Sequence, residues 1–86
     1  MTCRIDRLLI EQEVVLRVSG RIAGEDVELL RRAIEEGGVV AIELAEVELV
    51  DRDAVRLLTL NEVSGIELRL CPAYIREWIS REQDRS

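Results

Sequence analysis

Residues 39–58 read VVAIELAEVELVDRDAVRLL, and this stretch decides the fold class. A continuous apolar run over 39–44 is typical of a strand that is covered on both faces in a parallel sheet. A connector over 45–50 stays apolar at alternate positions, and three charged residues, 51–53, follow it. A helical pattern with one apolar side then begins at Ala54. The stretch therefore predicts a strand that passes almost directly into a helix, with a charge cluster at the junction.

The segments on either side complete an alternating order of strands and helices. Period-two and helical patterns, with glycine and polar residues between them, mark the boundaries. The expected elements are strands over 3–9 and 14–19 joined by a polar turn, a helix over 24–36, the strand and helix above, a strand over 66–70 and a helix from Pro72. This β-β-α-β-α-β-α order predicts an α/β fold, with an N-terminal hairpin and an open, mostly parallel sheet against which helices pack.

Length and charge restrict the possible partners. The chain has 86 residues, 48% of them hydrophobic, which predicts a single domain over 1–86 with a frayed tail at 82–86. The formal net charge of -6 argues against nucleic acid and against anionic membrane surfaces, since both attract basic proteins. The N-terminal segment contains charges throughout and predicts neither a signal peptide nor membrane insertion. We therefore expect a cytoplasmic protein.

The amino-acid composition also excludes most catalytic mechanisms. All twelve basic residues are arginine, and the chain has no histidine, so lysine and histidine chemistry is impossible. The two cysteines, Cys3 and Cys71, match no metal-binding spacing and are expected to be small buried hydrophobic residues. Asp51 and Asp53 are a pair of carboxylates without a nucleophile or a histidine nearby in the sequence. We therefore expect no enzymatic activity, no cofactor and no metal.

Two interpretations of the charge cluster remain open. The first N–H groups of a helix have no intrahelical partners and present partial positive charge. Asp51 is a good N-cap candidate, and Asp53 would lie in the first turn, so both aspartates are explained by helix initiation alone. A helix start also tolerates an anion that a partner protein recognises, and an exposed Arg52 would reach a partner carboxylate.

The order of motifs resembles the STAS domain, the module of anti-sigma factor antagonists. Ser19-Gly20-Arg21 matches the end of an early strand in that family. Glu43-Leu44-Ala45 stands where the family has Asp-Leu-Ser, and residues 47–51 match the approach to its key loop. The resemblance covers residues 13–71. Three departures accompany it: Asp53 occupies the position of the Ser or Thr that a kinase phosphorylates, Ala54 replaces a glycine, and the C-terminal part is shortened.

The resemblance implies a non-enzymatic regulatory module that binds an anti-sigma factor or a related kinase-like switch protein. Its expected partner-binding residues are Asp51, Arg52, Asp53, Ala54 and Arg56. Because Asp53 has no hydroxyl, phosphorylation at this position would not regulate the protein. An alternative within the family is a small cytoplasmic subunit bound to the ATPase of an ABC-type lipid transporter. The shortened C-terminus also leaves a homodimer as an option, since an uncovered sheet edge needs protection.

Overall fold

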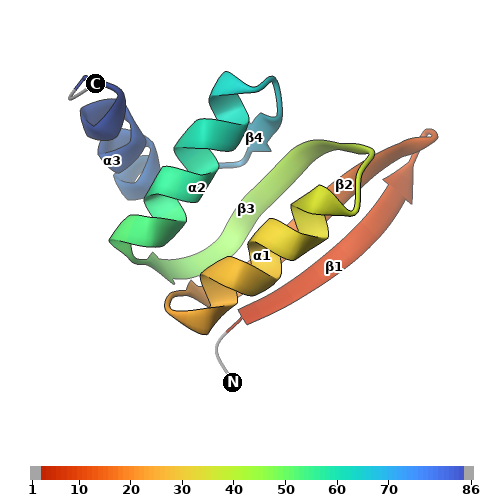
Figure 1. Cartoon of the computed structure of the whole chain (residues 1–86), viewed down its shortest axis with the longest axis horizontal. Coiled ribbons are helices and arrows are strands. Elements are labelled where there is room, and N and C mark those ends of the chain that lie inside the picture. The colour runs from red at the N-terminus through yellow and green to blue at the C-terminus, as the bar shows by residue number, and fades with distance from the viewer. Residues whose placement is uncertain (1–2, 85–86) are drawn as a thin grey trace.

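The predicted α/β fold is confirmed by a computed structural model, which describes residues 3–84 (Figure 1). The elements follow one another in the predicted β-β-α-β-α-β-α order. Their bounds are β1 (Cys3–Ile10), β2 (Glu13–Ile22), α1 (Glu25–Glu35), β3 (Val39–Val50), α2 (Arg52–Val63), β4 (Glu67–Arg69) and α3 (Ala73–Asp84). Within residues 3–84, no helix has both the length and the apolar character needed to cross a membrane.

The sheet has the strand order β1-β2-β3-β4. The first pair of strands is antiparallel, and the other two pairs are parallel. The hairpin closes through Glu11 and Gln12, whose φ angles are 51° and 70°. Positive φ at both central residues gives a two-residue turn whose twist matches that of the flanking strands. The polar segment expected to be a turn therefore joins β1 directly to β2.

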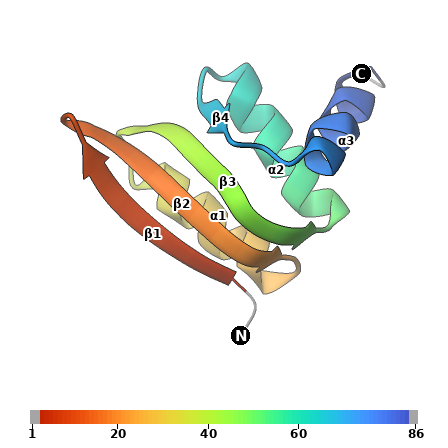
Figure 2. The same cartoon turned by 180° about the vertical axis from the view of Figure 1, so that it is seen from behind.

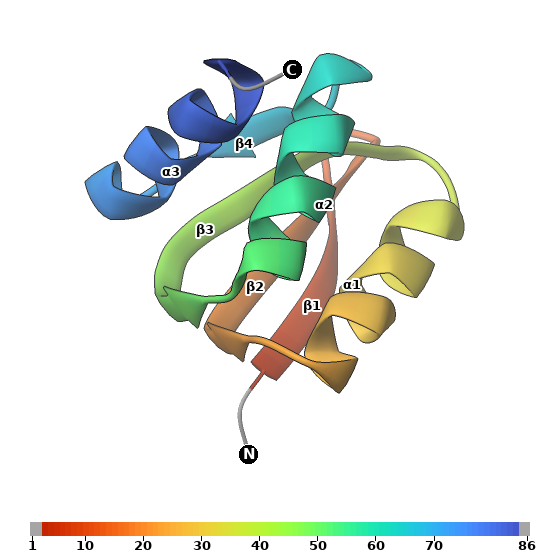
Figure 3. The same cartoon turned by 60° about the vertical axis from the view of Figure 1, so that its left-hand side comes forward.

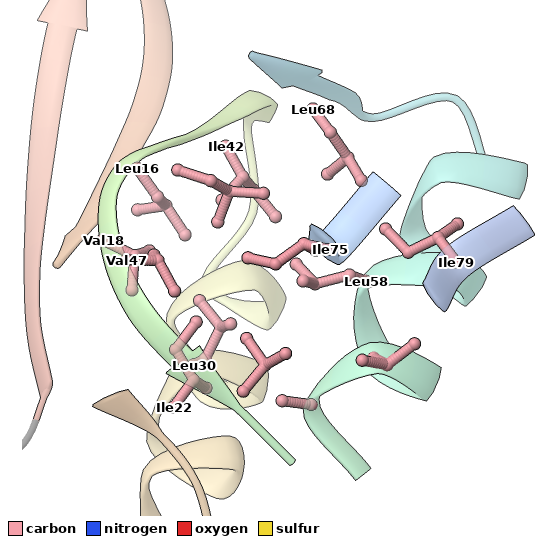
Figure 4. Packing of buried hydrophobic residues seen from close by; sticks show 14 residues of the cluster. Leu16, Val18, Ile22, Leu30, Ile42, Val47, Leu58, Leu68, Ile75 and Ile79 are labelled. Atoms are coloured by element: carbon pink, nitrogen blue, oxygen red, sulfur yellow. The ribbon is translucent and has the colours of Figure 1, made fainter. Parts of the chain in front are cut away.

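Helices α1 and α2 lie on one face of the sheet, as the front and back views show together (Figures 1 and 2). Helix α2 lies between α1 and α3 (Figure 3), and the core fills the space between the helices and the strands (Figure 4). Leu16 and Val18 of β2 are fully buried, whereas Arg17 between them is exposed on the other face. This alternation directs Leu16 and Val18 toward the helices, whereas Val15, which is also buried, lies on the same face as Arg17.

The uncovered face of the sheet carries a row of alternating charges. The register places Asp6 beside Arg17, Arg17 beside Glu43, and Glu43 beside Arg69. The Arg17 Nε donates to Glu43 Oε1 at 3.0 Å. Opposite charges on neighbouring strands stabilise a sheet, so the row suits a face that no helix covers in residues 3–84.

The prediction that 45–50 is a connector was wrong, because β3 continues to Val50. Strand β2 does not end at Gly20 either but extends to Ile22, and this gives the second half of β3 a partner. Gly20 has a φ of 85° and lies next to a shift in the register between the two strands. The glycine therefore permits a local irregularity within a long strand rather than its end.

Two predictions at the C-terminal side also need correction. Helix α3 extends to Asp84, so residues 82–84 are not a frayed tail, and residues 85–86 lie outside the described part of the chain. Glu82 is half-buried and pairs with Arg56 of α2, which holds this turn of the helix. Strand β4 has only three residues, because Leu70 adopts a φ of 53° and leaves the ladder with its side chain exposed.

Candidate functional site

Asp51 joins the starts of two helices. As the N-cap of α2, its Oδ1 accepts from the backbone N–H of Ala54 at 2.8 Å. Its Oδ2 accepts from the backbone N–H of Gly24 at 2.9 Å. Gly24 is the N-cap of α1 and has no side chain with which to cap that helix. One carboxylate therefore fixes the positions of α1 and α2 relative to each other, and Asp51 has a structural role.

Ala54 belongs to the core and not to a partner surface. Its side chain is fully buried, as are those of Val55 and Leu58 on the same inner face of α2. The helix begins at Arg52, two residues earlier than the apolar pattern indicated, and this start directs position 54 toward the sheet. The prediction that Ala54 contacts a partner is therefore wrong. The small side chain is suited to the close packing of α2 on the core.

Arg52, Asp53 and Arg56 are all exposed, as their predicted role requires. Asp53 lies in the first turn of α2, where the helix dipole favours a negative charge. Within residues 3–84, its carboxylate makes no hydrogen bond and no ion pair. Arg56 keeps more than half of its side chain exposed, although its Nε lies 3.8 Å from Glu82 Oε1. The structure thus separates the charge cluster into an inward-facing Asp51 and outward-facing neighbours.

Two exposed apolar side chains lie further along α2, on the same face as these charged residues. Leu60 and Val63 are 67% and 71% exposed. Residues three and four apart share one face of a helix, so Arg52, Asp53, Arg56, Leu60 and Val63 form a continuous strip that we call the α2 stripe. A shallow groove of about 330 Å³ borders the stripe where α2 meets Glu82 and Gln83 of α3.

The apolar half of the α2 stripe was not predicted, although the sequence contains a sign of it. The inner face of the helix is already supplied by Ala54, Val55 and Leu58. Leu60 and Val63 fall on the opposite side, at helical spacing from Arg56. Large apolar residues on a helix face that does not contact the core mark a candidate interaction surface.

Hydroxyl groups around the site are engaged with the backbone. Tyr74 Oη donates to the carbonyl of Val47 at 3.4 Å, while the residue as a whole remains 45% exposed. Burial raises the pKa of Tyr74. Thr59 Oγ1 donates to the Val55 carbonyl, one turn earlier in α2, at 2.7 Å.

Both cysteines are half-buried and free. Burial raises the pKa of the Cys3 thiol and of the Cys71 thiol, with Arg76 opposing the rise at Cys71. Across the described residues, no group of three or more histidine, cysteine, aspartate or glutamate side chains is arranged to hold a metal ion.

A comparison with models of known protein families found no match, and a comparison with curated proteins also found none. The α2 stripe and the sequence motifs that precede it are therefore the observations from which a function is inferred.

Proposed function

We propose that this protein is a non-enzymatic regulatory module that binds another protein through the α2 stripe, in the manner of an anti-sigma factor antagonist. The observation that carries the proposal is the continuity of the stripe, from exposed charges at the start of α2 to exposed Leu60 and Val63. Apolar side chains beside a charged rim are the usual composition of protein interfaces. The resemblance of residues 13–71 to STAS domains supports the same choice of partner class.

Asp53 supplies a constant negative charge in this proposal. It takes the position at which the STAS pattern has a phosphorylated Ser or Thr. It carries one charge, whereas a phosphoserine carries close to two, so it imitates the modified state only partly. With no partner for its carboxylate in residues 3–84, Asp53 is available to an arginine of the bound protein. The partner then recognises a permanent carboxylate instead of a phosphate that is added and removed.

A second candidate is the small STAS subunit of an ABC-type lipid transporter, bound to the ATPase. Leu60 and Val63 are both exposed in the single chain. This favours the second candidate, because a subunit that stays bound to the ATPase keeps such side chains covered. The absence of a hydroxyl at Asp53 agrees with this constitutive role. Both candidates use the α2 stripe and differ in the identity of the protein that it binds.

The test begins with proteins captured from the source cell by the wild-type chain and by Leu60→Glu. The matched control is Leu70→Glu, since Leu70 is also 67% exposed but lies after β4, away from the stripe. We expect a partner that wild type and Leu70→Glu retain and Leu60→Glu loses. Mass spectrometry then identifies it as a kinase-like anti-sigma factor or as an ABC ATPase. Equal retention by all three chains would refute the α2 stripe as the binding surface.

The role of Asp53 is tested with the purified partner and calorimetry. If the partner reads the acid, Asp53→Ser and Asp53→Asn both weaken binding, by about tenfold for one charge-assisted hydrogen bond. If the negative charge of Asp53 instead keeps the protein from binding a kinase-like partner, Asp53→Ser gains such a partner, which wild type does not bind. Unchanged binding by both variants would leave Asp53 as a helix-starting residue only.

A further inference from the structure

The two edges of the sheet are protected very differently. Strand β4 forms one edge and has three residues, which leaves little backbone for another chain to pair with. Strand β1 forms the other edge over Cys3–Ile10, with no proline and with an unbroken register against β2 (Figure 1). Within residues 3–84, no element covers the outer edge of β1. A long, regular edge strand is a template for pairing with another strand.

The hairpin determines which backbone groups β1 presents outward. A two-residue turn makes Ile10 and Glu13 a hydrogen-bonded pair, and such pairs then alternate along the antiparallel ladder. Residues 4, 6, 8 and 10 consequently direct their backbone groups toward β2. Residues 3, 5, 7 and 9 direct theirs to the free edge.

Side-chain charges on β1 select one antiparallel register with a second copy of the same strand. Arg4 and Asp6 project from the uncovered face of the sheet, where Arg4 Nε lies 3.2 Å from Asp6 Oδ2 in the same chain. With Ile5 opposite Ile5 of the second copy, each Arg4 lies opposite the other copy's Asp6. The smallest shift that keeps the outward-directed backbone groups paired moves one strand by two residues along the other. This shift brings either Arg4 opposite Arg4 or Asp6 opposite Asp6. Only the first of these three registers is attractive, since like charges directly opposite destabilise a strand pair.

We infer that the protein forms a two-fold symmetric homodimer through β1, with Ile5 on the symmetry axis. The outward backbone groups of residues 3, 5 and 7 pair with those of residues 7, 5 and 3 of the second copy. Two such sheets become one continuous sheet, and the self-complementary Arg4 and Asp6 specify its register. Isologous pairing of this kind closes on itself and does not extend into fibres.

A groove beside β1 supports a second copy as the occupant. The groove, of about 420 Å³, lies between β1 and α1 and is lined by apolar side chains and by three charged ones: Cys3, Ile5, Leu16, Leu29 and Ala33, with Arg7, Arg32 and Glu36. Leu29 is 52% exposed in the single chain. A two-fold axis perpendicular to the joined sheet places both α1 helices on the same face, so each chain's groove and Leu29 border those of the other. Pairing at the edge therefore also covers apolar surface next to it.

The inferred dimer leaves the proposed binding surface free. In Figure 1, helix α1 lies between α2 and the β1 edge. Both copies then present the α2 stripe on the same face of the joined sheet. A dimer would bind a dimeric partner at two points, which raises the effective affinity without any new contact.

Charge exchange at β1 tests the inference, with sedimentation equilibrium as the measurement. Wild type is expected to dimerise, and Arg4→Asp and Asp6→Arg should each weaken dimerisation by about 10- to 100-fold, because each variant places like charges opposite each other twice. The mixture of the two variants and the double variant Arg4→Asp/Asp6→Arg should both restore the dimer. Glu67→Arg, on the short edge strand β4, is the matched control and should dimerise as wild type does.

Three results would overturn the inference. These are a monomeric wild type at high micromolar concentration, unchanged dimerisation in both single variants, and a loss that neither the mixture nor the double variant restores. A strand of another protein on the β1 edge would produce the first result. None of these outcomes bears on binding through the α2 stripe, which the Leu60→Glu experiment measures separately.

A cross-link reports the register directly. In a chain with Cys3→Ser and Cys71→Ser, Ile5→Cys places two thiols opposite each other, with α-carbons about 5.5 Å apart, within the range of a disulfide. Oxidised glutathione should convert this variant to a covalent dimer, whereas Leu8→Cys in the same background should remain monomeric on a non-reducing gel. The reverse pattern would contradict the register.

Discussion

Replacing Asp51 by alanine removes the carboxylate that fixes the starts of both α1 and α2. The lost N-cap bond to the Ala54 N–H costs about 1 kcal/mol in comparable helices. The lost bond to the Gly24 N–H is charge-assisted but solvent-accessible, so it adds about 1 kcal/mol and not the full value of a buried bond. We therefore expect Asp51→Ala to lower the free energy of unfolding by about 2 kcal/mol, or the melting temperature by roughly 8–16 °C.

Urea unfolding at neutral pH, followed by circular dichroism, measures this loss. Asp51→Asn retains one acceptor oxygen and should lose about half as much stability. Asp53→Ala is the control: it removes an aspartate two residues away that has no hydrogen bond in residues 3–84, and should cost about 0.5 kcal/mol through the helix dipole. The reasoning fails if Asp51→Ala is no more destabilising than Asp53→Ala.

Three further predictions concern the core, a helix end and a thiol. Leu58→Ala removes a fully buried side chain and should cost about 2–5 kcal/mol in urea unfolding; less than 1 kcal/mol would place Leu58 outside the core. Arg7→Ala removes donors to the carbonyls of Ala33 and Gly37 at the end of α1, and should cost about 1 kcal/mol and increase amide exchange there. Because burial raises its pKa, Cys71 has less thiolate at a given pH than a free thiol. Its alkylation by iodoacetamide should therefore rise at higher pH than that of glutathione, and matching pH profiles would contradict this.

The element order could be predicted because each segment carries its own hydrophobic period. The continuous run in β3 and the alternation around Leu68 needed no long-range information. The second half of β3 was missed, although Glu46 and Glu48 alternate with buried Val47 as in a half-exposed strand. Its pairing depends on β2 continuing past a glycine, which local patterns do not reveal.

The candidate site was predictable only where it depends on neighbouring residues. The N-cap role of Asp51 follows from its place before a helical pattern. Its second bond, to Gly24, joins residues 27 positions apart and required the structure. Ala54 was misassigned because family position, not helix phase, suggested its role. Leu60 was overlooked because a large apolar residue in a helix is first read as core.

Binding of a partner by the α2 stripe is tested most directly by mapping amide chemical-shift changes on this 9.8 kDa chain when the captured partner is added. The predicted result is a set of large changes at Arg52, Asp53, Arg56, Leu60 and Val63, with little change on the uncovered face of the sheet. Changes that centre on Arg17 and Glu43 instead, with the α2 stripe unaffected, would contradict the proposed binding surface.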